Sequence, residues 1–341
     1  MKFIMYHSSL AKKNNAIITK MTLPKDIPIL IIGAGSIGER HIGVLQSLGY
    51  HNLHVFRQRM LPLRNVANDS VRCFTDFNEI DYIKPYAAII CTPTAQHLPQ
   101  AIACVARGIH VLVEKPLTHE VEALGELKQL AQQKNVLVQV AYMLRYHPLM
   151  QQLKTIIQSN RFDNLLSFST YWGEYLPNWH PWEDYRTSYA ARKELGGGVA
   201  LTLSHDLDIV NWLMGDLPIT WQRSFNTRSN LEVNVEAGAS FLLDYKNGIT
   251  GVVQLNYYQK IPKRTYDFVF DDAIVHFDYF KNKLEIQTES NIEIIENTGF
   301  QRDNMFRYQT IDFLNNTQSK PINSLTKSYL NESEAIIKMC S

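Results

Sequence analysis

Three groups of residues have types and spacings suited to chemistry, and they occur in a fixed order along the chain. A glycine-rich turn spans Gly33 to Gly38, Glu114-Lys115-Pro116 follows, and the triplet Gly196-Gly197-Gly198 precedes Ser204-His205-Asp206-Leu207-Asp208. The first pattern is typical of dinucleotide binding, the second offers a proton-transferring lysine, and the third supplies polar side chains from a later part of the chain. The ordered set indicates a nicotinamide-dependent oxidoreductase that acts on a hydroxyl or carbonyl group of a small polyol-like substrate.

The glycine turn has the spacing Gly-x-Gly-x-x-Gly, after a predicted strand and at the start of a predicted helix. Gly33 permits a tight turn, Gly35 lets the backbone approach a pyrophosphate, and Gly38 lets helix and strand pack closely. The helix N-terminus, with Ser36 and Ile37, faces the phosphates. A glycine-rich turn without a ligand is the alternative, but the strand-turn-helix context favours dinucleotide binding.

The end of the second predicted strand bears on the choice between NAD and NADP. A site for NAD usually carries an acidic residue there, whereas this chain has Arg57-Gln58-Arg59 after Phe56. Arginines pair with a 2′-phosphate, and without a carboxylate nothing repels that phosphate. We therefore predict NADP(H) in preference to NAD(H), with Arg57 in the cofactor site. The alternative is that both arginines point into water.

Further cofactor contacts are expected where the fourth predicted strand ends. Thr92 and Pro93 follow that strand directly, and ligands of doubly wound sheets lie outside the carboxyl ends of the strands. We expect these two residues to line the nicotinamide side of the crevice. His97 is assigned to the same site, with a surface position in the first turn of the next helix as the alternative.

Lys115 comes directly after the fifth predicted strand, on the same edge of the sheet. Hydride transfer from an alcohol carbon needs a base for the hydroxyl proton, and the reverse direction needs an acid. Near the cationic oxidised nicotinamide, the pKa of a lysine amine falls from about 10.4 toward a value useful for proton exchange. We predict that Lys115 is this acid and base and that Glu114, also in the cofactor site, holds it in position. The alternative is a solvated surface lysine.

His205 is predicted to be a second acid/base or a substrate ligand. Thr202, His205 and Asp206 are spaced by three and four residues, so they would share one face of a helix. Thr202 is then a substrate contact, and Asp206 takes the role of partner to His205. The alternative is that His205 and Asp208 cap or brace the helix.

Aromatic and basic side chains gather between Trp172 and Lys193. Aromatic faces suit the apolar side of a sugar ring, and arginines suit a carboxylate or phosphate. We predict substrate contacts at Tyr185 and Arg186, and at Arg145 where the two predicted domains join. The alternative is that the tryptophans cover the domain interface and the charges are solvated.

Together these residues resemble the glucose-fructose oxidoreductase / inositol dehydrogenase / rhizopine catabolism (Gfo/Idh/MocA) family. The resemblance is carried by Gly33, Gly35, Gly38, Thr92-Pro93, His97, Glu114-Lys115-Pro116, Arg145-Tyr146, Gly196-Gly197-Gly198, His205 and Asp208. It implies that Lys115 is the proton-relay lysine, before a cis bond to Pro116. It also implies that the second-domain sheet is the interface of a homodimer or homotetramer.

The stretch from Trp182 to Arg186 resembles a subgroup of this family associated with bacterial surface-polysaccharide sugars, which makes an anionic or nucleotide-linked sugar the leading substrate class. One position departs from the family pattern, since many members have an Asp four residues before the His, where this chain has Leu201. A dinucleotide-binding sensor or regulator is therefore an alternative, although the intact Lys115 argues against it. A redox-neutral, NAD-dependent glycosidase of the same fold is another.

The elements that must position these residues follow from the hydrophobic pattern. Apolar runs at 29–32, 53–56, 71–74, 87–91, 110–113 and 136–140 alternate with helical patterns at 37–48, 96–107 and 121–133. Such alternation predicts a parallel sheet covered on both faces. Later runs form successive hairpins, one of them around Asn247-Gly248, and a helix is expected through 203–214.

We therefore predict an α/β Rossmann domain over 27–147, followed by an α+β domain over 148–341 with a mostly antiparallel open sheet. The second domain is assigned to substrate binding and oligomerisation, and it is expected to end in helices at 305–314 and 332–339. Residues 1–26 are expected to form a tail or a surface element, without the apolar block of a secretion signal.

Composition agrees with a soluble globular protein, since 45% of the 341 residues are hydrophobic and 20% are charged. The net charge of +1 gives no electrostatic case for nucleic acid or an anionic membrane as partner, and no apolar run approaches the roughly 20 residues of a bilayer span. The four cysteines lack Cys-x-x-Cys spacing, so neither a metal site nor a disulfide framework is indicated. We predict a reducing, cytoplasmic location.

Overall fold

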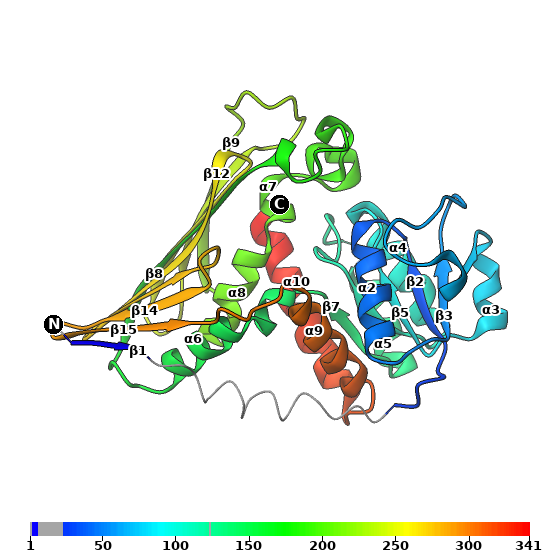
Figure 1. Cartoon of the computed structure of the whole chain (residues 1–341), viewed down its shortest axis with the longest axis horizontal. Helices are drawn as coiled ribbons and strands as arrows, with labels where there is room; N and C mark the ends of the chain where they lie inside the picture. The colour runs from blue at the N-terminus through cyan, green and yellow to red at the C-terminus, as the bar shows by residue number, and fades with distance from the viewer. Residues whose placement is uncertain (1, 6–22, 123) are drawn as a thin grey trace. The chain divides into compact units, whose positions relative to one another are not determined.

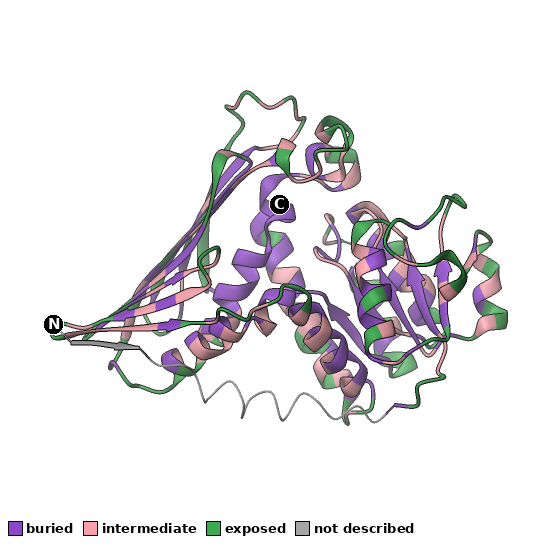
Figure 2. Cartoon of the chain, in the orientation of Figure 1, coloured by how far each residue is buried: buried purple, intermediate pink, exposed green. Residues whose placement is uncertain are grey.

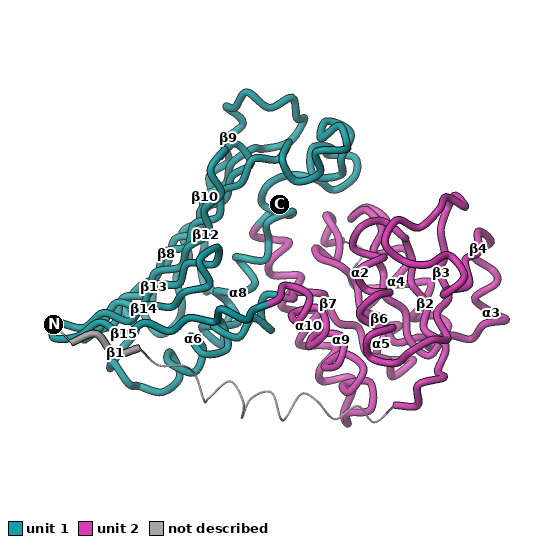
Figure 3. The backbone as a smooth tube through the Cα atoms, viewed as in Figure 1, with its two compact units in different colours: residues 1–15, 144–300, 340 teal, residues 16–143, 301–339, 341 magenta. Residues whose placement is uncertain are grey.

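The computed structural model, drawn in Figure 1, describes residues 2–5, 23–122 and 124–341. Its internal contacts divide the chain into two compact units (Figure 3). One comprises 16–143, 301–339 and 341 and is called the parallel-sheet unit below; the other comprises 1–15, 144–300 and 340 and is called the large-sheet unit. Among the described residues, no helix combines the length and the apolar composition needed to cross a bilayer.

The parallel-sheet unit is built on six parallel strands in the order β4-β3-β2-β5-β6-β7. Their bounds are β2 (Ile29–Ile32), β3 (Leu53–Phe56), β4 (Arg72–Phe74), β5 (Ala87–Ile90), β6 (His110–Val113) and β7 (Val138–Val140). The central strands β2 and β5 are buried at every residue, because helices cover both faces of a parallel sheet. The expected parallel sheet is confirmed.

Helices and short turns connect these strands. The helices are α2 (Ser36–Ser47), α3 (Ile80–Ile83), α4 (Thr94–Ala106) and α5 (Leu124–Lys134). α4 packs with α5, and α2 packs with α9 (Asp303–Asn316). One-turn 3-10 helices lie at Asn68–Ser70 and Phe77–Glu79 here, and at Met143–Tyr146, Leu176–Asn178, Tyr185–Thr187, Tyr189–Ala191 and Lys193–Leu195 further along the chain.

Two C-terminal helices, α9 and α10 (Ile322–Cys340), belong by their contacts mostly to the parallel-sheet unit. Arg40 of α2 forms an ion pair of 3.1 Å with Asp303 of α9. The hydroxyl of Thr326 in α10 donates to the carbonyl of Val136 at 3.0 Å. The sequence-based division assigned these helices to the second domain, whereas these contacts join them to the parallel-sheet unit.

The large-sheet unit has nine strands in the order β1-β15-β14-β13-β12-β8-β11-β10-β9. Their bounds are β1 (Lys2–Met5), β8 (Leu165–Tyr175), β9 (Thr220–Asn226), β10 (Gly238–Asp244), β11 (Thr250–Asn256), β12 (Tyr258–Phe270), β13 (Ile274–Asp278), β14 (Lys283–Gln287) and β15 (Asn291–Glu296). Only β1 with β15 and β8 with β11 pair in parallel, so the predicted mostly antiparallel sheet is confirmed for the described chain. The hairpin at Asn247-Gly248 joins β10 to β11 as predicted.

Strand β1 falls within the segment that was expected to be a tail or surface element. Its backbone adds a parallel strand beside β15. Residues 1 and 6–22, which the same expectation covers, lie outside the described residues.

Three helices, α6 (Pro148–Gln158), α7 (Val199–Thr202) and α8 (His205–Met214), lie against one face of the large sheet (Figure 2). The strands alternate accordingly, as in an antiparallel sheet with one packed face. Phe241, Val253 and Phe268 are buried against the helices, whereas Leu242 and Val269 on the opposite face are 42% and 36% exposed.

Candidate active site

The turn between β2 and α2 has the shape that the glycine motif requires. Gly33 has a φ of 93°, which L-residues rarely adopt. A Cβ on Gly38 would lie 2.1 Å from the carbonyl oxygen of Gly33, so only glycine allows the helix to come so close. A Cβ on Gly35 would meet nothing within 4 Å, so the backbone there borders open space. No described side chain caps α2, and this open, uncapped helix start fits a pyrophosphate.

The segment after β3 is fastened to α2. The carboxylate of Glu39, buried in the first turns of α2, accepts hydrogen bonds from the backbone N–H groups of Arg64 at 3.0 Å and Asn65 at 2.6 Å. Arg57 stands at the start of this segment, and its Nε is buried without a hydrogen-bond partner among the described residues. Sequence reasoning missed Glu39; its only signal was an acidic residue in the first turn of a helix.

His97 is 2% exposed, so the alternative of a surface position is wrong. Its Nδ1 lies 2.7 Å from the carbonyl oxygen of Pro116, and its Nε2 lies 2.6 Å from that of Thr92. Burial lowers the pKa of His97, although the two carbonyls favour its charged form. The ring thus connects the end of β5 to the segment after β6, where the Lys115–Pro116 bond is cis as the resemblance implied.

Glu114 is held by a histidine that sequence reasoning missed. Nε2 of His41, in α2, lies 2.9 Å from Oε1 of Glu114, and the His41 side chain is fully buried. Burial acts to raise the pKa of Glu114, but the hydrogen bond from His41 and the positive charges nearby, including that of Lys115, outweigh it and lower the pKa. Glu114 is therefore a carboxylate next to the half-buried Lys115.

In the large-sheet unit, His205 begins α8 and is 5% exposed, with its ring centroid 6.3 Å from that of Trp172. The next residue, Asp206, is fully buried, and its Oδ2 lies 2.5 Å from Nη2 of Arg264. Burial raises the pKa of Asp206, and the Arg264 charge opposes that rise. Sequence reasoning did not identify Arg264.

Arg264 is itself enclosed by aromatic side chains. Its guanidinium carbon lies 3.7 Å from the centre of the Trp172 ring and 5.0 Å from that of Tyr279, and its Nε donates to the Tyr266 hydroxyl at 2.7 Å. We call Asp206, Arg264, Trp172 and Tyr266 the Arg264 cluster. It fixes the start of α8, which carries His205.

Arg145, a predicted substrate contact, forms a two-point ion pair with the buried Asp208, with Nε 2.9 Å from Oδ2 and a second, shorter contact from Nη2 to Oδ1. Asp208 thus braces α8, as the alternative reading proposed. Thr202 is buried in α7, where its hydroxyl interacts with that of Tyr257.

The helix expected through 203–214 is confirmed from His205 onward as α8. Thr202, however, ends the separate helix α7, so it does not share one continuous helix with His205 and Asp206. At Leu203 the backbone ψ is 18°, and the next N–H bonds the carbonyl three residues back rather than four. This tighter turn ends α7, and α8 begins after it.

Tyr185 and Arg186 lie in the loop that follows β8. The Tyr185 hydroxyl accepts from the backbone N–H of Glu232 at 3.1 Å. Arg186 is 48% exposed and pairs with Asp184 at 2.9 Å and with Glu232 at 3.5 Å. The Arg186 charge is therefore exposed to solvent, as the alternative interpretation predicted.

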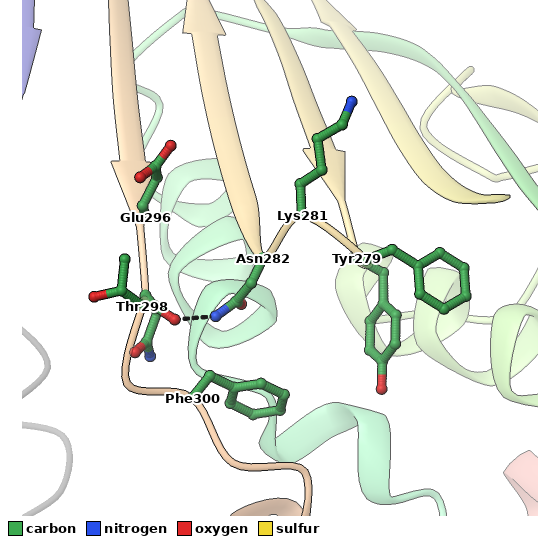
Figure 4. A pocket seen from close by; sticks show the side chains of 8 residues that line it. Tyr279, Lys281, Asn282, Glu296, Thr298 and Phe300 are labelled. Atoms are coloured by element: carbon green, nitrogen blue, oxygen red, sulfur yellow. Dashed lines mark hydrogen bonds between the residues drawn. The ribbon is translucent and has the colours of Figure 1, made fainter. Parts of the chain in front are cut away.

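A hollow of about 410 Å³ adjoins the Arg264 cluster through Tyr279. It is lined by Tyr279, Phe280, Lys281, Asn282, Glu296, Asn297, Thr298 and Phe300. In Figure 4 the rings of Tyr279 and Phe300 are among the side chains that line it, and the Asn282 amide is directed at the segment after β15. No sequence motif indicated this hollow.

Comparisons with known proteins agree with the two-sheet fold described above. The family model described as "Oxidoreductase family, NAD-binding Rossmann fold" (GFO_IDH_MocA) matches residues 27–142, and the GFO/IDH/MocA C-terminal domain model matches 150–276. The rhizopine catabolism protein MocA of Rhizobium meliloti is 24% identical over 66% of this chain and 69% of its own length. Levoglucosan dehydrogenase of Pseudarthrobacter phenanthrenivorans is 27% identical over 56% of this chain and 52% of its own.

The matches thus span only about half of the length of several curated relatives, including 53% of the uncharacterized oxidoreductase sll0816 of Synechocystis. Among solved structures, levoglucosan dehydrogenase in complex with NADH and levoglucosan superposes with a TM-score of 0.77 at 16% identity, covering 92% of this chain and 97% of that one. myo-Inositol 2-dehydrogenase from Lactobacillus plantarum gives 0.74 at 17% identity, covering 93% and 95%. At these identities the structures establish a common fold, and the predicted fold class is confirmed.

Proposed function

The chain belongs to the Gfo/Idh/MocA family of oxidoreductases, and on that basis we propose that it transfers a hydride between a nicotinamide cofactor and a hydroxyl or carbonyl carbon. The substrate class that we propose is a sugar, an inositol or a nucleotide-sugar-like molecule. The observation that carries the proposal lies in the parallel-sheet unit. Lys115 is the second residue after β6, which is two strands from β2 and its open glycine turn, or about 10 Å across the sheet.

The residues present fit a dinucleotide. Backbone N–H groups at Gly35, Ser36 and Ile37 would hold the pyrophosphate, and Thr92 and Pro93 would border the nicotinamide. When bound, the nicotinamide supplies the hydride acceptor or donor. The other requirement, a proton acceptor and donor, has to come from the protein.

Lys115 takes the hydroxyl proton during oxidation and returns it to the carbonyl oxygen during reduction. The neighbouring carboxylate of Glu114 favours the ammonium form of this lysine. We assign His205 to the substrate, as a ligand or second acid/base. Asp206 and Arg145 are assigned to positioning α8, since each is engaged in an ion pair within the large-sheet unit.

The test is a screen of inositols, hexoses, uronates and nucleotide sugars with both cofactors. Turnover is measured by the near-ultraviolet absorbance of the reduced nicotinamide. We expect steady turnover that falls at least about 100-fold in Lys115→Ala, while the dissociation constant of the cofactor is retained. Lys128→Ala, which breaks an ion pair to Glu334, is the control and should turn over normally. Normal turnover in Lys115→Ala would contradict the proposal. Release of sugar without a net change in absorbance would indicate a glycosidase. Binding of the cofactor with neither turnover of the cofactor nor release of sugar would indicate a sensor.

We propose that NADP(H) is preferred over NAD(H). Support comes from the absence of an acidic residue at 57–59 and from Arg57, whose buried Nε has no partner among the described residues. Arg57→Ala should raise the KM for NADP(H) about 10-fold more than that for NAD(H), because a hydrogen bond to a charged group is worth about 1.5–3 kcal/mol. A KM for NAD(H) well below that for NADP(H) in the unaltered enzyme would overturn the preference.

We also propose that the exposed face of the large sheet joins copies of this chain into a homodimer or homotetramer. Leu242, Val269 and Ile274 are exposed there, at 36–46% of their surface, and none of α6, α7 and α8 covers them. We also propose a cytoplasmic location, because the four cysteines are free thiols, as in a reducing compartment. Cell fractionation tests this location.

A further inference from the structure

We propose that His41 is a positioning residue for Lys115: its hydrogen bond holds the Glu114 carboxylate charged and in place beside the lysine. The proposal rests on the function proposed above, in which Lys115 exchanges the proton. It concerns only groups of the parallel-sheet unit.

The contact joins two elements that meet at the cofactor edge of the sheet. His41 is in α2, 73 residues before Glu114, and its Nε2 lies 2.9 Å from Oε1 of Glu114. The His41 side chain is fully buried, and that of Glu114 is 13% exposed. The His41 ring also packs edge-on against Phe306 of α9, with centroids 5.5 Å apart. The imidazole is therefore held by both neighbours.

The surroundings of His41 decide its tautomer. Its Nδ1 is buried without a hydrogen-bond partner in the described chain. A proton on Nδ1 would be a buried donor without an acceptor, which is unfavourable. The proton of the neutral ring is therefore on Nε2, where it is donated to Glu114. A donor fixed in this way requires an acceptor, which the ionised carboxylate provides best.

The other groups around Glu114 do not replace His41. The ring nitrogens of His97, in α4, face the carbonyls of Thr92 and Pro116. The Cys91 thiol, after β5, belongs to a half-buried residue, and desolvation together with the Glu114 charge raises its pKa, so it stays neutral. Lys115 contributes its positive charge. His41 thus supplies the hydrogen bond that keeps the largely desolvated carboxylate of Glu114 ionised.

Removing this donor has a defined consequence. Burial then favours the protonated form of Glu114, and Lys115 loses the negative charge that stabilises its ammonium form. The amine of Lys115 therefore loses its proton at a lower pH. Oxidation, which needs the neutral amine, extends to a lower pH as well.

The experiment measures the Lys115 amine in the cofactor-free protein, by competitive acetylation across pH and mass spectrometry of the Lys115 peptide. In His41→Phe, which keeps a ring but no donor, we expect the midpoint to fall by about half a pH unit or more, about threefold in the protonation equilibrium. Glu114→Gln should give the same fall, and the double variant should add little. In His41→Gln, which keeps an N–H donor, the midpoint should fall less than in His41→Phe.

The matched control is His110→Asn, a change at the opposite end of β6, where the histidine accepts from the backbone N–H of Leu137 at 2.9 Å. It should leave the midpoint unchanged. An unchanged midpoint in folded His41→Phe, or additive shifts in the double variant, would overturn the proposal. If His41→Phe does not fold, an unchanged midpoint in Glu114→Gln overturns it equally. Because no substrate is used, this result is separate from failure of the turnover screen.

Discussion

The carboxylate of Asp206 and the guanidinium of Arg264 form a buried ion pair, with Oδ2 and Nη2 2.5 Å apart. Asp206 is the second residue of α8, and Arg264 lies in β12, so the pair ties the helix that carries His205 to the sheet. Removing two charges from water is costly, and the cost is offset only while both partners are present. Stacking of the guanidinium on Trp172 and its bond to Tyr266 complete the enclosure.

Replacing Arg264 by Met leaves Asp206 without its partner. We expect the free energy of unfolding, measured in urea, to fall by about 3–5 kcal/mol. The double variant Arg264→Met/Asp206→Leu should recover most of this loss, since apolar pairs often replace buried ion pairs without penalty. Arg186→Met, which breaks an exposed pair, is the control and should show no measurable change. A double variant as unstable as the single one would contradict the ion-pair explanation.

Much of the parallel-sheet unit could be predicted from the sequence. The runs at 29–32, 53–56 and 110–113 correspond residue for residue to β2, β3 and β6, because buried parallel strands are continuous apolar runs with polar ends. The C-terminal helix was underestimated. Its expected bounds were 332–339, but α10 begins at Ile322, and its first turns, rich in Ser, Thr, Asn and Lys, show little apolar periodicity.

Local backbone shape was predictable where motifs specify it, as in the turn at Gly33–Gly38 and in the cis Lys115–Pro116 bond. Pairs that form between distant segments were not. Arg264 is 58 residues from Asp206, and His41 is 73 residues from Glu114, and nothing in either local pattern indicates its partner. The break between α7 and α8 was missed for a related reason, since Leu203 and Ser204 fit a helical pattern and only the backbone departs from it.

Two glycines of the turn should separate folding from cofactor binding. In Gly38→Ala the new Cβ meets the Gly33 carbonyl at 2.1 Å, so we expect a loss of about 1–3 kcal/mol in the free energy of unfolding. Gly35 has extended backbone with φ −78° and open space around it, so Gly35→Ala should unfold like the parent. It should nevertheless weaken dinucleotide binding by about 10-fold or more, since its methyl group occupies the space in front of the phosphates. Unaltered binding by Gly35→Ala, measured by calorimetry, would show that the turn does not hold the pyrophosphate.

The exposed face of the large sheet can be tested through Leu242, which is 42% exposed. If this face joins copies of the chain, Leu242→Asp places a charge in an apolar interface, and we expect dissociation to single chains in light scattering. Tyr82→Asp is the matched control, because Tyr82 is 88% exposed on the parallel-sheet unit. A wild-type protein that is monomeric at all concentrations, or an assembly that survives Leu242→Asp, would contradict the proposed interface.

His147 should make stability depend on pH. It is fully buried before α6, and its Nδ1 accepts from the backbone N–H of Leu149 at 3.2 Å. Its ring packs against Phe300, with centroids 4.3 Å apart. Burial, aided by the charge of Arg264, lowers the pKa of His147 to about 3. In the unfolded chain the same imidazole binds a proton below a pH of about 6.5.

Between these two pKa values the unfolded state therefore binds more protons than the folded state. The free energy of unfolding consequently falls as the pH falls. The contribution of His147 to this fall is about 1.4 kcal/mol per pH unit. His147→Asn keeps an acceptor suited to a helix N-terminus and removes the titration. In urea unfolding between about pH 6 and pH 4, the variant should lose stability less steeply than the parent by that amount. Other buried histidines such as His97 titrate in both proteins and cancel in the difference. Parallel curves would mean that the imidazole of His147 takes up a proton in the folded protein as readily as in the unfolded chain.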